Sequence, residues 1–125
     1  MEYQKPQFKQ EYDEFMSYYK TNPVGTEEIG KTIGRQIQLY GDLVRVFVDT
    51  KIAFGRRLAE LEQSVDENTG KVYSSAKAEK IADSLPEGVA LLRSEWDMKL
   101  AMEQVGALRN MQQGVRAEMN MSGGI

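Results

Sequence analysis

The sequence predicts an all-α protein built around an antiparallel, coiled-coil-like hairpin of two long helices. Three observations indicate this fold class. Large apolar side chains recur from Ile29 to Val65 in steps that mostly alternate between four and three residues, a second long segment carries apolar side chains at helical spacing, and a polar turn separates the two. A helix of this length is not stable alone in water, so its apolar side must lie against another helix.

The 3.5-residue repeat is the a and d pattern of a coiled coil, and Lys51 is the one charged residue in it. A lysine at such a position either sets the register and number of helices or lifts its ammonium group to the surface. Both interpretations remain open. The residues that we expect in this seam on the first long helix are Ile29, Ile33, Ile37, Tyr40, Val44, Phe47, Phe54, Leu58, Leu61 and Val65.

The first expected element is a short amphipathic helix over about residues 7–19. It lies in an N-terminal segment, residues 1–22, that is rich in Phe and Tyr at helical spacing. Residues 21–25 contain Asn, Pro and Gly and break this helix.

The first long helix is expected over residues 26–64. Thr26 can cap free backbone amides, and the acidic Glu27 and Glu28 suit the positive end of the helix dipole. Residues 44–49 alternate and are β-branched like a strand, but the heptad pattern continues on both sides of them, so we predict a helix there.

The connection, residues 65–88, begins with a polar turn that has Gly70 where a left-handed residue is wanted. A short amphipathic helix over residues 75–84 follows, and a proline then resets the chain direction. The last long helix is expected over residues 87–119, and residues 120–125 form a tail.

The last helix carries two apolar stripes, and we expect Trp96 in the core because tryptophan is usually largely buried. An interface position for Trp96 stays open. The first stripe is Val89, Leu92, Trp96 and Leu100, and the second is Ala101, Val105, Leu108, Val115 and Met119.

The first long helix has more apolar surface than one partner helix covers, because Leu39, Leu43, Val46 and Ile52 flank its seam. A lone hairpin would leave this surface in water, which favours a homo-oligomer. The alternative is that the two short helices cover it within one chain. The number of subunits stays open, since mixed Ile, Val, Phe and Tyr give no clear preference.

The composition excludes several kinds of site. The 125 residues form one small domain and include neither Cys nor His, so disulfides and thiolate metal sites are excluded and the commonest general base is missing. Neither a Gly-x-x-x-x-Gly-Lys-Ser/Thr loop nor a Gly-x-Gly-x-x-Gly motif is present. We expect no enzyme activity, no cofactor and no metal site.

The N-terminal residues lack the basic region and apolar run of a secretory signal. The densest apolar stretch, residues 39–54, carries too many charged side chains to span a bilayer. We therefore expect an intracellular, cytoplasmic protein without a membrane partner.

The formal net charge is −3, but the basic residues are unevenly placed. An antiparallel hairpin brings several of them together at the end away from its turn, where nucleic-acid phosphate is one plausible ligand. The alternative is solvated surface charge offset by the acidic N-terminal segment. These basic residues are Lys31, Arg35, Arg45, Arg109 and Arg116, and a second group consists of Lys51, Arg56 and Arg57.

The second group belongs to the pattern Lys-Ile-Ala-Phe-x-x-Arg-Leu at residues 51–58. A polar turn with glycine, Tyr73, a short helix at residues 77–83 and a long helix with Trp96 follow it. This order over residues 29–118 resembles the UvsY-like recombination mediators, small helical-hairpin proteins of tailed-phage recombination modules.

The resemblance implies a ring-like homo-oligomer that binds single-stranded DNA in the bacterial cytoplasm. Such proteins load a recombinase onto DNA covered by single-strand-binding protein. The basic positions of the family pattern correspond to Lys51 and Arg57, with Arg56 beside them, and Gly55 stands where the family has another basic residue.

Three functions follow as hypotheses. The first is a recombination mediator whose weak phosphate contacts add up around an oligomer. The second is a structural or scaffolding helical module of a phage, in the virion or in its assembly. The third is a small inhibitor that binds a host enzyme through the acidic N-terminal segment. Salt-sensitive binding of single-stranded DNA distinguishes the first from the others.

Overall fold

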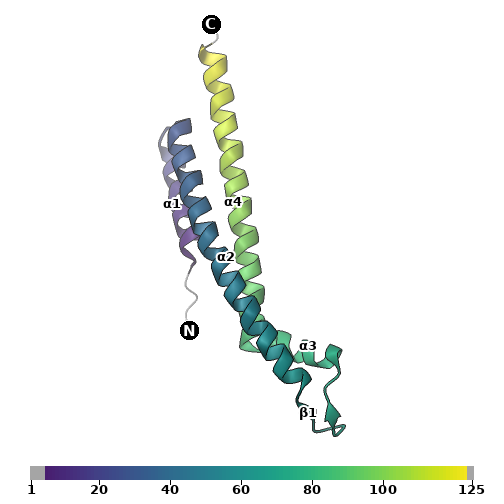
Figure 1. The fold of residues 1–125 in the computed structure, drawn as a ribbon. Helices are drawn as coiled ribbons and strands as arrows, with labels where there is room; N and C mark the ends of the chain where they lie inside the picture. The colour runs from purple at the N-terminus through teal and green to yellow at the C-terminus, as the bar shows by residue number, and fades with distance from the viewer. Residues whose placement is uncertain (1–4, 124–125) are drawn as a thin grey trace. The chain divides into compact units, whose positions relative to one another are not determined.

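The structure, a computed structural model, describes residues 5–123 and confirms the all-α fold class with a helical hairpin. Within these residues it contains four helices and one short hairpin of two strands (Figure 1). In chain order these are α1 (Gln7–Thr21), α2 (Thr26–Glu62), β1 (Val65–Asp66), β2 (Lys71–Val72), α3 (Ser75–Ser84) and α4 (Pro86–Gly123).

The chain divides into two compact units. The first comprises Met1–Asp42 and Met98–Ile125, and the second comprises Leu43–Asp97. The long helices α2 and α4 each contribute to both units, so each unit contains one antiparallel pair of α2 and α4 segments.

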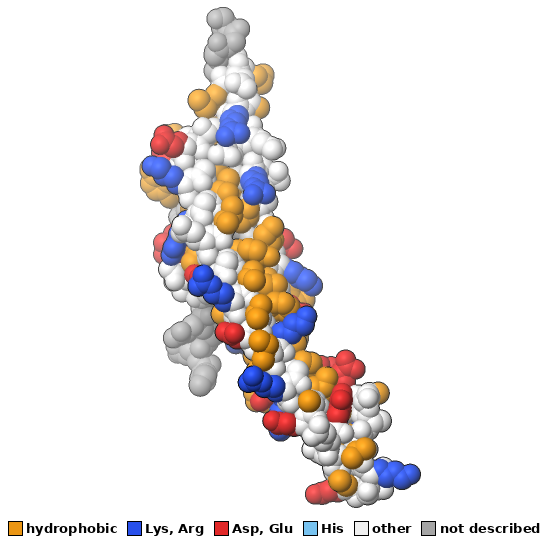
Figure 2. Space-filling view, viewed as in Figure 1, with side chains coloured by type: hydrophobic (Ala, Val, Ile, Leu, Met, Phe, Trp, Pro, Cys, Tyr) orange, Lys and Arg blue, Asp and Glu red, His pale blue; other side chains and the backbone are white. Residues whose placement is uncertain are grey.

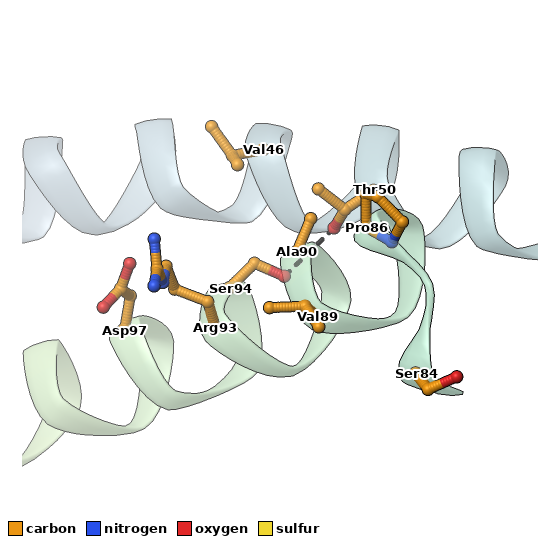
Figure 3. A pocket seen from close by; sticks show the side chains of 9 residues that line it. All are labelled: Val46, Thr50, Ser84, Pro86, Val89, Ala90, Arg93, Ser94 and Asp97. Atoms are coloured by element: carbon orange, nitrogen blue, oxygen red, sulfur yellow. Dashed lines mark hydrogen bonds between the residues drawn. The ribbon is translucent and has the colours of Figure 1, made fainter. Parts of the chain in front are cut away.

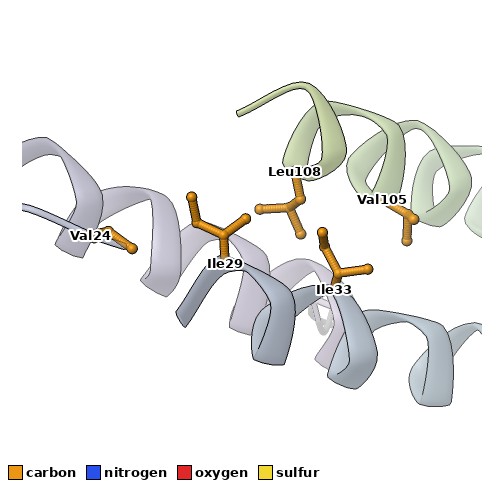
Figure 4. Close-up of a cluster of buried hydrophobic side chains, with 5 residues drawn as sticks. All are labelled: Val24, Ile29, Ile33, Val105 and Leu108. Atoms are coloured by element: carbon orange, nitrogen blue, oxygen red, sulfur yellow. The ribbon is translucent and has the colours of Figure 1, made fainter. Parts of the chain in front are cut away.

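The first unit has its core between α2 and α4, with α1 packed against it. Aromatic side chains of α1 reach this core, and Phe8 at the start of α1 is fully buried. Figure 4 shows the central side chains, which point toward one another from the two long helices and from the segment that precedes α2. They are Val24, Ile29, Ile33, Val105 and Leu108, with Tyr12, Phe15, Tyr19, Met111 and Val115 around them.

Polar contacts fix α1 to α2 in this unit. The amide of Gln36, which is fully buried, donates a hydrogen bond of 2.9 Å to the backbone oxygen of Phe8. The guanidinium of Arg35 donates two hydrogen bonds, of 2.8 and 3.0 Å, to the carboxylate of Glu11. The paired fork geometry fixes orientation as well as distance.

The second unit has its core where α3 packs against the end of α2. The buried side chains of Leu61, Ala78 and Ala82 form its centre, and Phe54 and Leu58 lie against them. Small alanines on α3 allow a close approach to the larger side chains of α2. The remaining contacts come from Tyr73, Ile81 and Leu85.

The hairpin that connects α2 to α3 depends on Gly70. Its φ of +70° is the left-handed conformation that glycine adopts without strain, and its amide donates to the backbone oxygen of Asp66 over 2.8 Å. Ser74 then caps α3, because its hydroxyl accepts a hydrogen bond of 3.2 Å from the amide of Lys77.

The inner seam of α2, meaning its more buried side, follows a regular heptad that differs from the expected seam. Gln36 is fully buried, whereas the expected Ile37 is 46 % exposed. Lys51 is also exposed, and the seam passes through Thr50 instead. The expected seam was assigned from the largest apolar residue of each helical turn. Its first two steps, from Ile29 to Ile33 and from Ile33 to Ile37, are therefore both of four residues. The inner seam consists of residues 29, 33, 36, 40, 43, 47, 50, 54, 57 and 61.

The expected seam position of Val65 is wrong, because Val65 belongs to β1, beyond the end of α2, and is 58 % exposed. The other residues of the expected seam lie on or beside the inner seam. Ile33 and Leu61 are buried, and Tyr40, Val44, Phe47, Phe54 and Leu58 are half-buried.

The core position expected for Trp96 is wrong, because its side chain is 63 % exposed. In α4 the seam through Val105 and Leu108 continues backward through Met98 and Ser94 in steps of four and three. The stripe with Trp96 lies on the opposite side of the helix, so the second stripe expected on α4 contributes to the core and most of the first does not. Val89 and Leu92 are about half exposed.

We expect glycine-to-alanine substitutions to act in opposite directions at two helical positions. At Gly34 a Cβ would meet nothing within 4 Å, so Gly34→Ala should raise the free energy of unfolding by up to about 1 kcal/mol through helix propensity. At Gly88 a Cβ would lie 2.3 Å from the backbone oxygen of Ala82, so Gly88→Ala should lower it by about 1–3 kcal/mol. Urea unfolding followed by circular dichroism measures both, and equal effects would contradict this packing.

Candidate functional site

The basic residues expected to bind nucleic acid are distributed over both units. Lys31, Arg35, Arg109 and Arg116 belong to the first unit, and Arg45, Lys51, Arg56 and Arg57 belong to the second. The second group of the sequence analysis, Lys51, Arg56 and Arg57, thus falls within the second unit, whereas Arg45 falls outside the unit that contains the rest of the first group.

Carboxylates engage three of these basic side chains. Arg35 is bound by Glu11. The guanidinium of Arg57 lies 2.8 Å from the carboxylate of Glu60, and the ammonium of Lys31 lies 3.8 Å from the carboxylate of Glu27. The hydrogen bond between Arg35 and Glu11 lowers the pKa of the Glu11 carboxyl and raises the pKa of the guanidinium. A phosphate would have to displace Glu11 to bind Arg35, so the N-terminal helix offsets this positive charge.

Four basic side chains have no ion pair with another described residue. Arg56, Arg109 and Arg116 are exposed, and the ammonium of Lys51 lies over the ring of Phe47, 5.7 Å from its centroid. On α2 in the second unit, Lys51 and Arg56 flank Ile52, one on each side. The cations of this helix therefore stand beside an apolar strip.

Two outward faces of the second unit are apolar. On α2, Val48 and Ile52 are about half exposed, and on α4 the exposed stripe is centred on Trp96. Figure 2 shows apolar side chains on the viewed surface over α2 and α4, with Lys and Arg side chains next to them. These faces remain exposed although α3, which belongs to the same unit, packs against the end of α2.

A hollow of about 520 Å³ opens between α2 and α4 within the second unit (Figure 3). The hydroxyls of Thr50 and Ser94 meet at its base, 3.0 Å apart. They also lie within hydrogen-bond distance of the backbone oxygens of Phe47 and Leu91, at 2.9 and 2.8 Å. The residues that line the hollow are Val46, Thr50, Ser84, Pro86, Val89, Ala90, Arg93, Ser94 and Asp97.

The chemistry of this hollow favours apolar contact. Only two hydroxyl hydrogens are available for the three hydrogen-bond contacts at its base, so both are used within the chain and neither hydroxyl has one to spare for a ligand. Neither hydroxyl is bonded to a side chain that could act as its base, as a nucleophile requires. The hollow is therefore suited to receiving an apolar side chain.

The sequence analysis missed an ion pair that holds the hairpin to α3. The carboxylate of Asp66, which is buried, lies 2.5 Å from the ammonium of Lys77 and accepts a hydrogen bond of 3.0 Å from the amide of Asn68. The ammonium also lies 5.6 Å from the ring centroid of Tyr73. This pair lowers the pKa of Asp66 and raises the pKa of Lys77.

No family model, curated protein or solved structure matches the chain. The likeness to the UvsY-like family therefore stays a prediction from the sequence. Among residues 5–123, no group of carboxylates is arranged to hold a metal ion, and no helix has the length and apolar character needed to cross a membrane.

We expect Asp66→Asn to destabilise the chain at neutral pH but not in acid. Because the folded state lowers the pKa of Asp66, its contribution to stability is complete above the ordinary aspartate pKa and disappears as the pH falls through the lowered value. Thermal unfolding of the variant and the parent at neutral and acid pH measures the difference. Glu67→Gln, an exposed change in the same turn, is the control, and a difference that persists in strong acid would contradict this role.

Proposed function

We propose that the chain is a non-enzymatic helical module that works by associating with further copies of itself. The observation that carries this proposal is the pair of outward apolar faces in the second unit. Soluble chains rarely leave large apolar surfaces in water unless another surface covers them. The large side chains that are about half exposed or more on these faces are Val48, Ile52, Val89, Leu92 and Trp96.

The charges beside these faces favour a second copy over a nucleic acid. On α2 the exposed Asp49 and Arg56 lie close to Ile52, so both signs occur within two helical turns. A surface with both signs is complementary to a copy of itself, whereas a phosphate backbone requires one sign. Among the functions expected from the sequence, self-association of this kind fits the structural or scaffolding module of a phage, in the virion or in its assembly.

We expect the mass of the chain in solution to rise with protein concentration. Sedimentation over about a hundredfold range of concentration measures this, because association follows mass action. The combined variant Ile52→Lys and Trp96→Lys places one charge on each outward face and should weaken association while leaving helicity unchanged, since both side chains are exposed.

The matched control is Asn110→Lys with Gln113→Lys, which adds the same two charges at exposed positions of the first unit. It should associate as the parent does. A parent chain that stays monomeric at the highest concentration would overturn the proposal.

A recombination mediator that binds single-stranded DNA is the second candidate. The exposed cations without a described carboxylate partner favour it, in particular Arg56 and the neighbouring Lys51. Its setting would be a complex with a recombinase and single-strand-binding protein, as the resemblance implies.

For this candidate we expect the affinity for a labelled single-stranded oligonucleotide to fall steeply as salt rises, because phosphate contacts release counterions. Arg56→Glu with Arg57→Glu should abolish the binding, and Lys71→Glu with Lys80→Glu is the charge-matched control. Fluorescence anisotropy at low and physiological salt measures both. A chain that fails to bind at low salt excludes this candidate and leaves the assembly module.

A further inference from the structure

The outward face of α2 in the second unit carries a second heptad pattern, which we call the outer seam. It consists of Val48, Ile52, Gly55 and Ala59, in steps of four, three and four residues. All four positions are exposed, and they lie away from the inner seam. Steps of this kind are what a further helix requires.

The geometry points to a second copy of the chain as the occupant: two α2 helices pack antiparallel along their outer seams, and Asp49 of each copy faces Arg56 of the other. This inference rests on the proposed function and assigns its interface and register.

Gly55 supports a close approach of another helix. A Cβ at this position would meet nothing within 4 Å, so no contact inside the chain requires glycine. Glycine in the interior of a helix costs about 1 kcal/mol relative to alanine. In the antiparallel pair Gly55 lies opposite Ile52 of the second copy, where the missing side chain makes room for the larger one.

The register follows from the spacing of the outer seam. With Ile52 opposite Gly55, Val48 comes opposite Ala59, so each layer pairs a larger side chain with a small one. Val48 and Gly55 are the d-type positions of the outer seam, and the residues that follow them are Asp49 and Arg56. Across an antiparallel interface, the residue that follows a d-type position in one helix meets a residue of the same kind in the other helix. In this register Asp49 meets Arg56, and the two-fold axis makes the contact twice.

Asp49 and Arg56 have no other described partner. Neither forms an ion pair or a side-chain hydrogen bond with another described residue. They stand seven residues apart on one helix, about 10.5 Å along its axis, which is too far for them to pair with each other. A second copy supplies each of them with a partner of opposite sign.

Other arrangements do not give this match. In a parallel, in-register pair of α2 helices the position before an a-type residue meets the position after the next d-type residue, which would place Lys51 of each copy beside Arg56 of the other. The same antiparallel construction on the outward face of α4, with Leu92 opposite Trp96, would place Arg93 beside itself. Like charges in these positions oppose association, so the charges select α2 and the antiparallel direction.

Charge reversal tests the register. Asp49→Arg leaves two arginines and Arg56→Asp leaves two aspartates at each contact, so each variant alone should dimerise about tenfold more weakly than the parent. An equimolar mixture of the two variants should regain the parent affinity, because each contact again joins opposite charges. A chain with both changes should regain it as well.

Sedimentation of each variant, the mixture and the parent measures the dissociation constants, with circular dichroism to check helicity. Glu79→Arg and Lys80→Asp, the same reversals at exposed positions of α3, should leave dimerisation unchanged.

The outcomes separate this inference from the proposed function. Single variants that dimerise like the parent, or a mixture that fails to recover, would overturn the Asp49–Arg56 register while self-association stands. A parent that is monomeric throughout would overturn both. If Arg56 served only to bind DNA, the chain with both Asp49→Arg and Arg56→Asp would still fail to bind DNA, and the second change would not recover any lost affinity.

Discussion

A long helix stays folded in water only where one continuous side of it is buried, and this requirement shapes both units. The two long helices meet it with inner seams of the same 3.5-residue repeat. The aromatic side chains of α1 and the alanines of α3 cover part of the apolar surface that the two long helices leave exposed. On the outward faces of the second unit, apolar side chains stay exposed among the described residues, and the proposed second copy would meet the same requirement there.

Polar groups inside the seams decide how the helices are placed. A buried amide or hydroxyl is costly unless it is hydrogen-bonded. The amide of Gln36 uses the backbone of α1, and the hydroxyl of Thr50 uses Ser94 on α4. The side-chain oxygens of Gln36 and Gln104 have no hydrogen-bond partner among the described residues. The first unit therefore tolerates some buried polarity in return for fixing the position of α1.

The local patterns of the sequence predicted the helices, the polar turn and the left-handed Gly70, since caps, breakers and periodicity act within a few residues. The phase of the inner seam was not predictable in this way. It depends on Gln36 and Thr50, whose partners stand 28 and 44 residues away in the chain. The partner of Arg35 was not predictable from local patterns for the same reason, because Glu11 stands 24 residues before it.

The hydroxyl pair of Thr50 and Ser94 also leaves the length of the segment that connects α2 to α4 free to vary. If α4 slipped by one heptad along α2, Ser94 would come opposite Leu43 or Arg57, and Thr50 would lose its hydroxyl partner. Alignment is thus encoded in the two helices rather than in the length of the link between them. Insertions or deletions in the exposed turn at Glu67–Thr69 should accordingly be tolerated during evolution without realigning the helices.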